Sequence, residues 1–299
     1  MVLTMGSAKA QMPWWKTLWL AVLAGFYLSF GGCLSFAVGG QMPAVMQDNP
    51  GLQKLVFGAF GLPFGLALIV ICGAELLTSN FAFLPVAMFE GKCNLWQVLK
   101  NWFIVFWGNL AGSLFLVWLV DEAYLFQQPA YKAGYLTSQT VAFAKTHSEW
   151  GDTVARGILC NWLVCLAVWQ ATAAQDIIGK IFGIFFPIMA FVAIGFDHVV
   201  ANMFVIPFGM KMGSNVSVGD FVWHSTIPVF IGNMIPAVFF VAMSYSFCYG
   251  TLMTTCRMRL GRFLPHKDPV VVDPPAAPRQ MGQNDSAFNH TVHAAEDKA

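Results

Sequence analysis

Charged side chains are scarce in this chain, and their scarcity excludes several classes of protein. Only 10% of the 299 residues are Asp, Glu, Lys or Arg, whereas 57% are hydrophobic, and the mean hydropathy is +0.62. Soluble globular domains carry about a quarter charged residues. The formal net charge of +1 also lacks the basic excess by which proteins attract nucleic-acid phosphates. An ordinary soluble domain and a nucleic-acid partner are therefore both excluded.

Signatures of enzymes and metal sites are missing as well. The sequence has no HExxH or GxSxG motif, and its seven cysteines form no CxxC pair. We therefore predict no cofactor and no metal, and we interpret the cysteines as packing residues. The opening residues, MVLTMGSAKAQMPWW, fit neither a secretory signal nor an Arg- and Ser-rich transit peptide. A transit peptide outside the printed numbering is left open.

What the sequence does have is six long apolar stretches, each sufficient for a helix to cross a hydrocarbon core roughly 30 Å thick. The predicted spans are residues 17–38, 52–90, 97–120, 153–174, 177–210 and 226–250. We expect an all-α, multi-pass membrane protein. Its expected parts are an N-terminal cytoplasmic segment (1–16), a six-span domain (17–256) and a polar, disordered cytoplasmic tail (257–299), whose composition cannot form a core.

The loop charges favour one orientation. Lys and Arg are in excess in the loops on the side of the termini, and the opposite loops carry more acidic residues. Because basic loops stay on the cytoplasmic side, both termini are predicted to face the cytoplasm or its organelle equivalent. The host membrane is left open between the plasma membrane and an organelle envelope such as that of the chloroplast.

Two of the spans are interrupted in the same way. Each reads Gly, any residue, an acid, four residues and then Asn, at Gly73, Glu75 and Asn80 in the second span and at Gly195, Asp197 and Asn202 in the fifth. Gly108-Asn109 and Gly232-Asn233 repeat at a similar offset, about 122 to 124 residues. Each half of the chain would cross the membrane three times, an odd number, so the two halves must have opposite orientations. Inverted repeats with matching broken helices indicate a transport site at mid-membrane. Chance similarity between glycine-containing helices is the alternative.

Ionisable groups in a bilayer cost roughly 2.5–3.5 kcal/mol each on insertion scales. The presence of Glu75, Asp197 and His198 inside predicted spans therefore requires an explanation. We interpret the two acids as acceptors for backbone N–H groups freed at the breaks, with a cation site or proton relay as the alternative. The position of His198 in the second break corresponds to Leu76 in the first. Because a polar ring is unfavourable in the membrane interior unless it lies beside a cavity, we expect His198 to line a pore. A satisfied core histidine is the alternative.

Further polar side chains lie at the same depth, namely Thr78, Asn80, Asn161 and Asn202. Such groups can replace part of an anion's hydration shell or tie helices together, and the second role is favoured for Asn109 and Asn233. An imidazole can also give a permeating anion a hydrogen bond or a proton near neutral pH. The alternatives to an anion pathway are a neutral-solute or ammonium channel and an intramembrane enzyme, which would lack a nucleophile or metal motif.

Four motifs resemble the formate/nitrite transporter family: GAELLTSN (73–80), NWLVCLAVW (161–169), GFDHVVANMF (195–204) and IPVFIGN (227–233). The resemblance covers about 17–250 and is closest to the algal nitrite/bicarbonate branch. It implies an aquaporin-like six-span protomer, assembled as a homopentamer with one pore in each protomer. The implied substrates are small anions such as nitrite, formate and bicarbonate.

The resemblance also implies residue roles. His198 would face the pore and share a hydrogen-bond network with Thr78 and Asn161, while Lys145, sixteen positions before Asn161, would be the external lysine that concentrates anions. Apolar constrictions are implied at Leu62, Leu66, Leu76, Leu77, Val164 and Phe191. Hydrogen-bond donors at Thr78, Asn161 and His198 would compensate the anion's lost hydration between these constrictions. Because a bare charge meets a desolvation barrier of several kcal/mol there, a proton from His198 or nearby water would let the neutral acid pass. Permeation of the anion without protonation is left open. Asp197 departs from the Glu usual in bacterial members but keeps the carboxylate.

Overall fold

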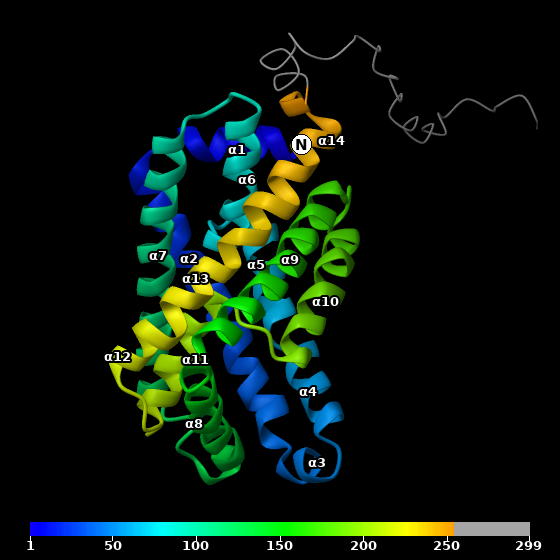
Figure 1. The fold of residues 1–299 in the computed structure, drawn as a ribbon. Helices are drawn as coiled ribbons and strands as arrows, with labels where there is room; N and C mark the ends of the chain where they lie inside the picture. The colour runs from blue at the N-terminus through cyan, green and yellow to red at the C-terminus, as the bar shows by residue number, and fades with distance from the viewer. Residues whose placement is uncertain (254–299) are drawn as a thin grey trace, which may run out of the picture. The chain divides into compact units, whose positions relative to one another are not determined.

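The computed structural model describes residues 1–253, which form helices and the connections between them (Figure 1). Within this part of the chain, six helical segments are long and apolar enough to cross a membrane: Trp14–Gln41, Pro50–Cys72, Leu95–Glu122, Trp150–Ala173, Ile177–Ile194 and Val218–Tyr249. The predicted all-α architecture with six spans is confirmed. The predicted tail, residues 257–299, lies outside the described residues.

The elements fall into two halves along the chain. The first half contains α1 (Val2–Gln11), α2 (Trp14–Val38), η1 (Gly39–Gln41), α3 (Pro43–Asp48), α4 (Pro50–Ala59), α5 (Leu62–Cys72), α6 (Leu77–Phe89) and α7 (Leu95–Glu122). The second half contains η2 (Pro129–Tyr131), α8 (Lys132–Thr146), α9 (Trp150–Ala173), α10 (Ile177–Ile194), α11 (Val199–Lys211), α12 (Val218–Asp220), η3 (Phe221–Thr226), α13 (Ile227–Ile235), η4 (Pro236–Met243) and α14 (Ser244–Tyr249). The π-helical segments η3 and η4 join α12, α13 and α14 into one continuous span.

Both predicted breaks are present, and each is shorter than the motif that marks it. Residues 73–76 separate α5 from α6, and residues 195–198 separate α10 from α11. The preceding helices end on glycines with left-handed backbone, Gly73 at φ 74° and Gly195 at φ 96°. Only glycine adopts such angles without a Cβ penalty. The second part of each motif is already helical.

Three segments contain more structure than the sequence predicts. Residues 1–16 include α1, which packs closely on α6: a Cβ on Gly6 would lie 2.1 Å from a backbone oxygen of that helix. The connection before the fourth span, expected to be a loop, forms α8 and holds Lys145 in its last turn. The second span has an additional break at Phe60 and Gly61, between α4 and α5.

The repeat extends beyond the breaks. The pair α1–α2 corresponds to α8–α9, because α2 and α9 each follow an extended residue, Pro13 at φ −56° and ψ 138° and Glu149 at φ −57° and ψ 141°. A lysine precedes each of these helices by five residues, Lys9 and Lys145. In Figure 1, α1 and α14 lie at one end of the bundle, and α3 and α8 lie toward the other. Because the number of crossings is even, the first and last helices of the described chain, α1 and α14, lie on the same side.

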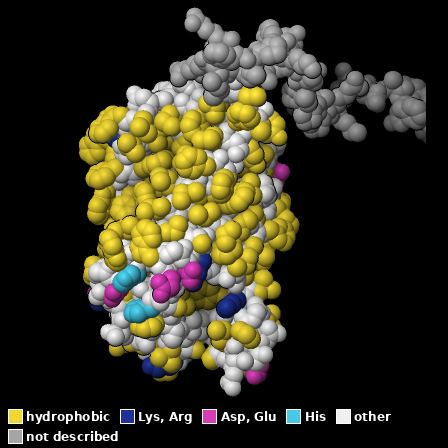
Figure 2. All heavy atoms as spheres, in the orientation of Figure 1, with side chains coloured by type: hydrophobic (Ala, Val, Ile, Leu, Met, Phe, Trp, Pro, Cys, Tyr) yellow, Lys and Arg dark blue, Asp and Glu magenta, His cyan; other side chains and the backbone are white. Residues whose placement is uncertain are grey.

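The outer surface is apolar over most of one face. Figure 2 shows hydrophobic side chains covering its upper part, with charged and histidine side chains gathered below them. Large side chains are widely exposed, including Trp96 at 73%, Phe103 at 67% and Ile178 at 70%. Soluble monomers rarely expose apolar surface on this scale, so this surface suits contact with lipid.

Candidate permeation site

Thr78 and His198 lie side by side where the two broken helices meet. Thr78 belongs to the first turn of α6, and His198 is the residue that precedes α11. Both are buried, and Thr78 Oγ1 lies 2.8 Å from His198 Nε2. His198 also caps its own helix, because its Nδ1 accepts a hydrogen bond of 3.0 Å from the Ala201 N–H. The fold thus joins two positions that are 120 residues apart.

These contacts define the protonation of the pair. Because His198 Nδ1 accepts a hydrogen bond, it carries no proton, and the neutral ring carries its proton on Nε2. Nε2 therefore donates to Thr78 Oγ1. The hydroxyl hydrogen of Thr78 then has no acceptor within residues 1–253 and is free for a substrate. A second proton on His198 would have to occupy Nδ1 and break the bond from Ala201.

Asn161 faces the pair from α9. Its Nδ2 donates to the backbone carbonyls of Thr78, at 3.3 Å, and Asn233, at 2.7 Å. Both amide hydrogens are taken, so Asn161 is not free to donate to an anion as the sequence predicts. Its Oδ1 is buried and has no partner among the described residues. Asn161 therefore offers an acceptor beside Thr78, which offers a donor.

The buried carboxylates do not accept from the freed backbone N–H groups, contrary to the sequence interpretation. Glu75 Oε1 instead lies 2.5 Å from Lys9 Nζ, and Glu75 Oε2 accepts from Asn80 Nδ2 at 2.7 Å. We call Lys9, Glu75 and Asn80 the first triad. Glu75 is only 2% exposed, and burying its charge is tolerable because it is paired.

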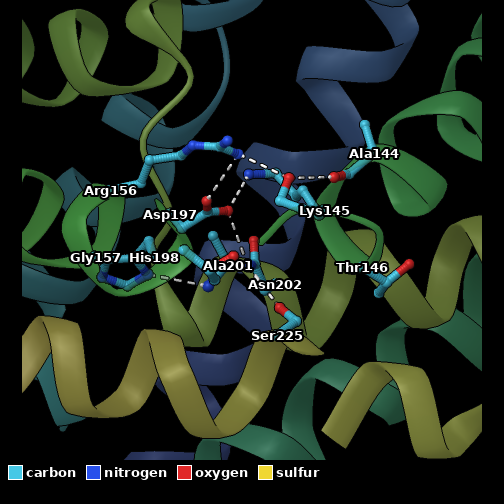
Figure 3. Close-up of polar contacts among 12 residues, drawn as sticks. Ala144, Lys145, Thr146, Arg156, Gly157, Asp197, His198, Ala201, Asn202 and Ser225 are labelled. Atoms are coloured by element: carbon cyan, nitrogen blue, oxygen red, sulfur yellow. Dashed lines mark hydrogen bonds and ion pairs between the residues drawn. The ribbon is translucent and has the colours of Figure 1, made fainter. Parts of the chain in front are cut away.

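The second half builds the same arrangement. Asp197 Oδ1 lies 2.6 Å from Lys145 Nζ and accepts from Asn202 Nδ2 at 3.3 Å (Figure 3). These three residues form the second triad. Asn202 also donates to Ser225 Oγ at 3.0 Å. Each triad ties an acid at a helix break to a lysine from the helix that precedes its half's first span.

Asn109 and Asn233 satisfy the backbone groups that the breaks release. Asn109 Oδ1 accepts from the first N–H of α6 at 3.0 Å, and its Nδ2 donates to a carbonyl of α2 and one of the break, at 2.8 and 2.9 Å. Asn233 makes the same three bonds in the second half, each of 2.9 Å. Both are fully buried. An unpaired backbone group in a membrane interior costs several kcal/mol, which explains these two positions.

Lys145 and Lys54 line a cavity of about 370 Å³. Neither His198, which the sequence predicts to line a pore, nor Thr78 forms part of its wall. Two of the six implied constriction residues, Leu62 and Phe191, form part of its wall. The Phe191 ring is nearly parallel to the His198 ring, at 20°, with centroids 5.9 Å apart. Phe191 thus lies between the cavity and His198. The other four implied constriction residues are buried and do not line the cavity: Leu66, Leu76, Leu77 and Val164.

Sequence reasoning missed three charged residues of the site: Lys54, which lines the cavity, Lys9 and Arg156. Lys9 lies in the segment to which no structure was assigned, although its position five residues before a tryptophan matches that of Lys145. Arg156 is in the second turn of α9, and its Nη1 lies 3.9 Å from Asp197 Oδ2. No pattern in the sequence connects Arg156 with Asp197, because their proximity arises only when α9 packs beside the second break.

An inverted pair of three-span halves, with polar groups between two broken helices and a cavity lined by two lysines beside them, defines a membrane channel or transporter for small solutes. The chain belongs to the formate/nitrite transporter family, whose sequence profile matches residues 1–247. It is therefore an integral, multi-pass membrane protein. Because the relatives are named transporters and channels, the intramembrane-enzyme alternative is set aside.

Individual relatives match along most of their length. A probable formate transporter of Methanothermobacter thermautotrophicus is 40% identical over 253 residues, which cover 81% of this chain and 91% of that protein. The formate channel FocA of Escherichia coli (strain K12) is 35% identical over 268 residues, covering 82% and 90%. A solved structure described as a pentameric formate channel with formate bound aligns with a TM-score of 0.69 at 28% identity, covering 79% of this chain and 97% of that one.

Proposed function

We propose that this chain forms a homopentamer in which each protomer passes formate and related small monovalent anions through its own pore. Nitrite and, as the algal branch would imply, bicarbonate are further proposed substrates. The observation that carries the proposal is the Thr78–His198 pair, joined at 2.8 Å between two helix breaks and separated by Phe191 from a cavity that Lys54 and Lys145 line. The pentamer is supported by the solved relative that is described as pentameric.

The pathway proposed here begins with electrostatic attraction. Lys54 and Lys145 raise the local concentration of anions in the cavity. Beyond Leu62 and Phe191 the surroundings are apolar, and a bare charge would meet a desolvation barrier of several kcal/mol. Protonation of the substrate removes most of this barrier. The proposed transport is therefore linked to a proton, and the neutral acid is the species that crosses.

The free hydrogen-bonding groups support the neutral acid. The Thr78 hydroxyl can donate to the carbonyl oxygen of an acid, and Asn161 Oδ1 can accept from its O–H. The formate and nitrite anions have no O–H to donate to Asn161. A proton relayed by His198 itself requires a doubly protonated ring and the loss of its bond from Ala201. Low pH on the side of origin would promote both routes.

The proposed orientation places α1 and α14 on the cytoplasm-equivalent side, in the plasma membrane or a chloroplast envelope. The support is the excess of basic residues in the loops at that end. Lys145 and its cavity then face the opposite compartment, and Lys9 faces the cytoplasm-equivalent one.

A counterflow panel in proteoliposomes tests the proposal. Labelled formate would be exchanged against unlabelled formate, nitrite or bicarbonate, and in a parallel assay labelled methylammonium against unlabelled methylammonium, each at one acidic and one neutral pH. We expect formate and nitrite to drive exchange, and we expect faster exchange at acidic pH because more of the substrate is protonated. Exchange of methylammonium without the anions would favour the ammonium alternative. Equal rates at both pH values would contradict the proton linkage and leave the anion pathway standing.

A further inference from the structure

The acid of each triad donates its backbone N–H to the first span of its half, at equivalent positions whose residues differ in charge. The Glu75 N–H donates to the carbonyl of Leu20 at 3.1 Å, and the Asp197 N–H donates to the carbonyl of Arg156 at 3.5 Å. Leu20 and Arg156 each follow the lysine of their own triad by eleven residues. Arg156 is thus the counterpart of an apolar residue. This substitution gives the second triad a cation that the first lacks.

Arg156 is placed to share Asp197 with Lys145. In Figure 3, dashed lines join each of the two cations to the Asp197 carboxylate. Lys145 approaches Oδ1 at 2.6 Å, and Arg156 Nη1 lies 3.9 Å from Oδ2 while it donates to Ser148 Oγ at 3.0 Å. Within residues 1–253, Glu75 has an ion pair with Lys9 alone. The second triad with Arg156 therefore carries one positive charge in excess, whereas the first is neutral.

Other charges near Arg156 do not cancel this excess. Glu149 and Asp152 lie at the start of α9, where both are exposed, and water and salt screen exposed charges strongly. Asp197 is only 1% exposed. Lys54, which lines the same cavity, adds to the positive charge.

We propose that Arg156 is the second counter-ion of Asp197 and thereby frees Lys145 to bind the permeating anion, whereas Lys9 stays paired with Glu75. This inference rests on the proposed anion pathway. Withdrawing the only cation from a buried carboxylate is strongly unfavourable. Arg156 stays charged at all relevant pH values, so Asp197 remains compensated when Lys145 turns toward a substrate. The end of the proposed pathway at Lys145 consequently binds anions more tightly than the end at Lys9.

The bond to Ser148 offers a purely structural role for Arg156, as an anchor of the connection between α8 and α9. The two roles predict different couplings. An anchor would act on assembly and stability whichever residue stands at 145. A counter-ion acts on anion affinity, and it does so through Lys145.

The test compares Arg156→Leu, which copies the residue of the first half, with the wild type in formate equilibrium exchange across proteoliposomes. We expect the half-saturating formate concentration to rise about fivefold or more, and its dependence on salt to weaken, because a local positive charge is lost. Arg156→Lys should restore the value to within about twofold. In a Lys145→Gln background, Arg156→Leu should add less than about a twofold change, since coupled residues are not additive.

Lys132→Gln is the matched control, because it removes one exposed positive charge from α8 away from Asp197. An unchanged half-saturating concentration in Arg156→Leu, or an equal effect in the Lys145→Gln background, would overturn the inference. If Arg156→Leu does not assemble, Arg156→Gln is compared with Arg156→Lys in the same assays. A wild type that exchanges no formate would contradict the proposed function. Calorimetric titration of the detergent-solubilised variants with formate would then still decide the role of Arg156.

Discussion

The two halves of the membrane domain agree in how their backbones are held and differ in the side chains they present to the pathway. Asn109 and Asn233 make the same three hydrogen bonds, one to the break, one to the helix that follows it and one to the first span of their half. The residues before α6 and α11 have nearly the same backbone, φ −101° and ψ 127° at Leu76 and φ −112° and ψ 121° at His198. Backbone groups in a membrane must be satisfied in both halves, which preserves the scaffold. Side chains at the same places are free to diverge.

This divergence concentrates the chemistry in the second half. Leu76 is apolar and 1% exposed, whereas His198 bonds Thr78 across the repeat axis. Likewise, Leu20 leaves Glu75 with one cation, and Arg156 gives Asp197 a second. An inverted repeat therefore supplies two equivalent scaffolds, and we propose that the unlike residues at equivalent positions set the direction and selectivity of transport.

The largest effect is expected when the imidazole of His198 is removed, because the second helix break then has an apolar residue at this position, as the first has in Leu76. His198→Phe should abolish formate exchange, because Thr78 loses its partner and the ring fills the passage with apolar surface. His147→Phe is the matched control, since His147 is exposed and stacks on Phe143 at 3.7 Å between ring centroids. Exchange in proteoliposomes and elution from a sizing column provide the measurements. Normal exchange by a correctly assembled His198→Phe variant would remove the central role assigned to this residue.

A second comparison separates the two triad lysines by stability. Lys9→Gln leaves the buried Glu75 without its cation and should cost on the order of 3 kcal/mol. Lys145→Gln should cost less, because Arg156 remains near Asp197. Thermal unfolding in detergent, with Lys132→Gln as the control for loss of a surface charge, measures both. A larger loss of Tm in Lys145→Gln than in Lys9→Gln would contradict the difference between the triads.

The smallest expected effect concerns the glycines that end α5 and α10. No atom lies within 4 Å of a Cβ built on Gly73 or Gly195, so alanine would be strained by backbone angle alone, at about 1–2 kcal/mol. Gly195→Ala should lower the Tm more than Gly73→Ala, because φ 96° lies farther than φ 74° from the left-handed well of other residues. An equal decrease in Tm for Gly73→Ala and Gly195→Ala would contradict this difference and would show that the neighbouring backbone relaxes at both breaks.

Much of this architecture can be predicted from the sequence alone. Hydropathy locates the six spans, and the shared spacing of glycine, acid and asparagine locates both breaks, because these features depend on residues close together in the chain. The same reasoning failed where partners come from distant segments. It assigned backbone N–H partners to Glu75 and Asp197, and it treated Asn161 as a donor although both its amide hydrogens are used.

The sequence by itself determined a bilayer-spanning chain with two inverted, interrupted halves, since apolar length and local spacing are sufficient for that. Only the tertiary structure decided which lysine meets which acid, that α1 and α8 are equivalent, and that Arg156 reaches Asp197. The physical reason is that a buried charge is stabilised by whatever lies within a few ångströms of it, and the packing of helices remote in sequence decides what that is.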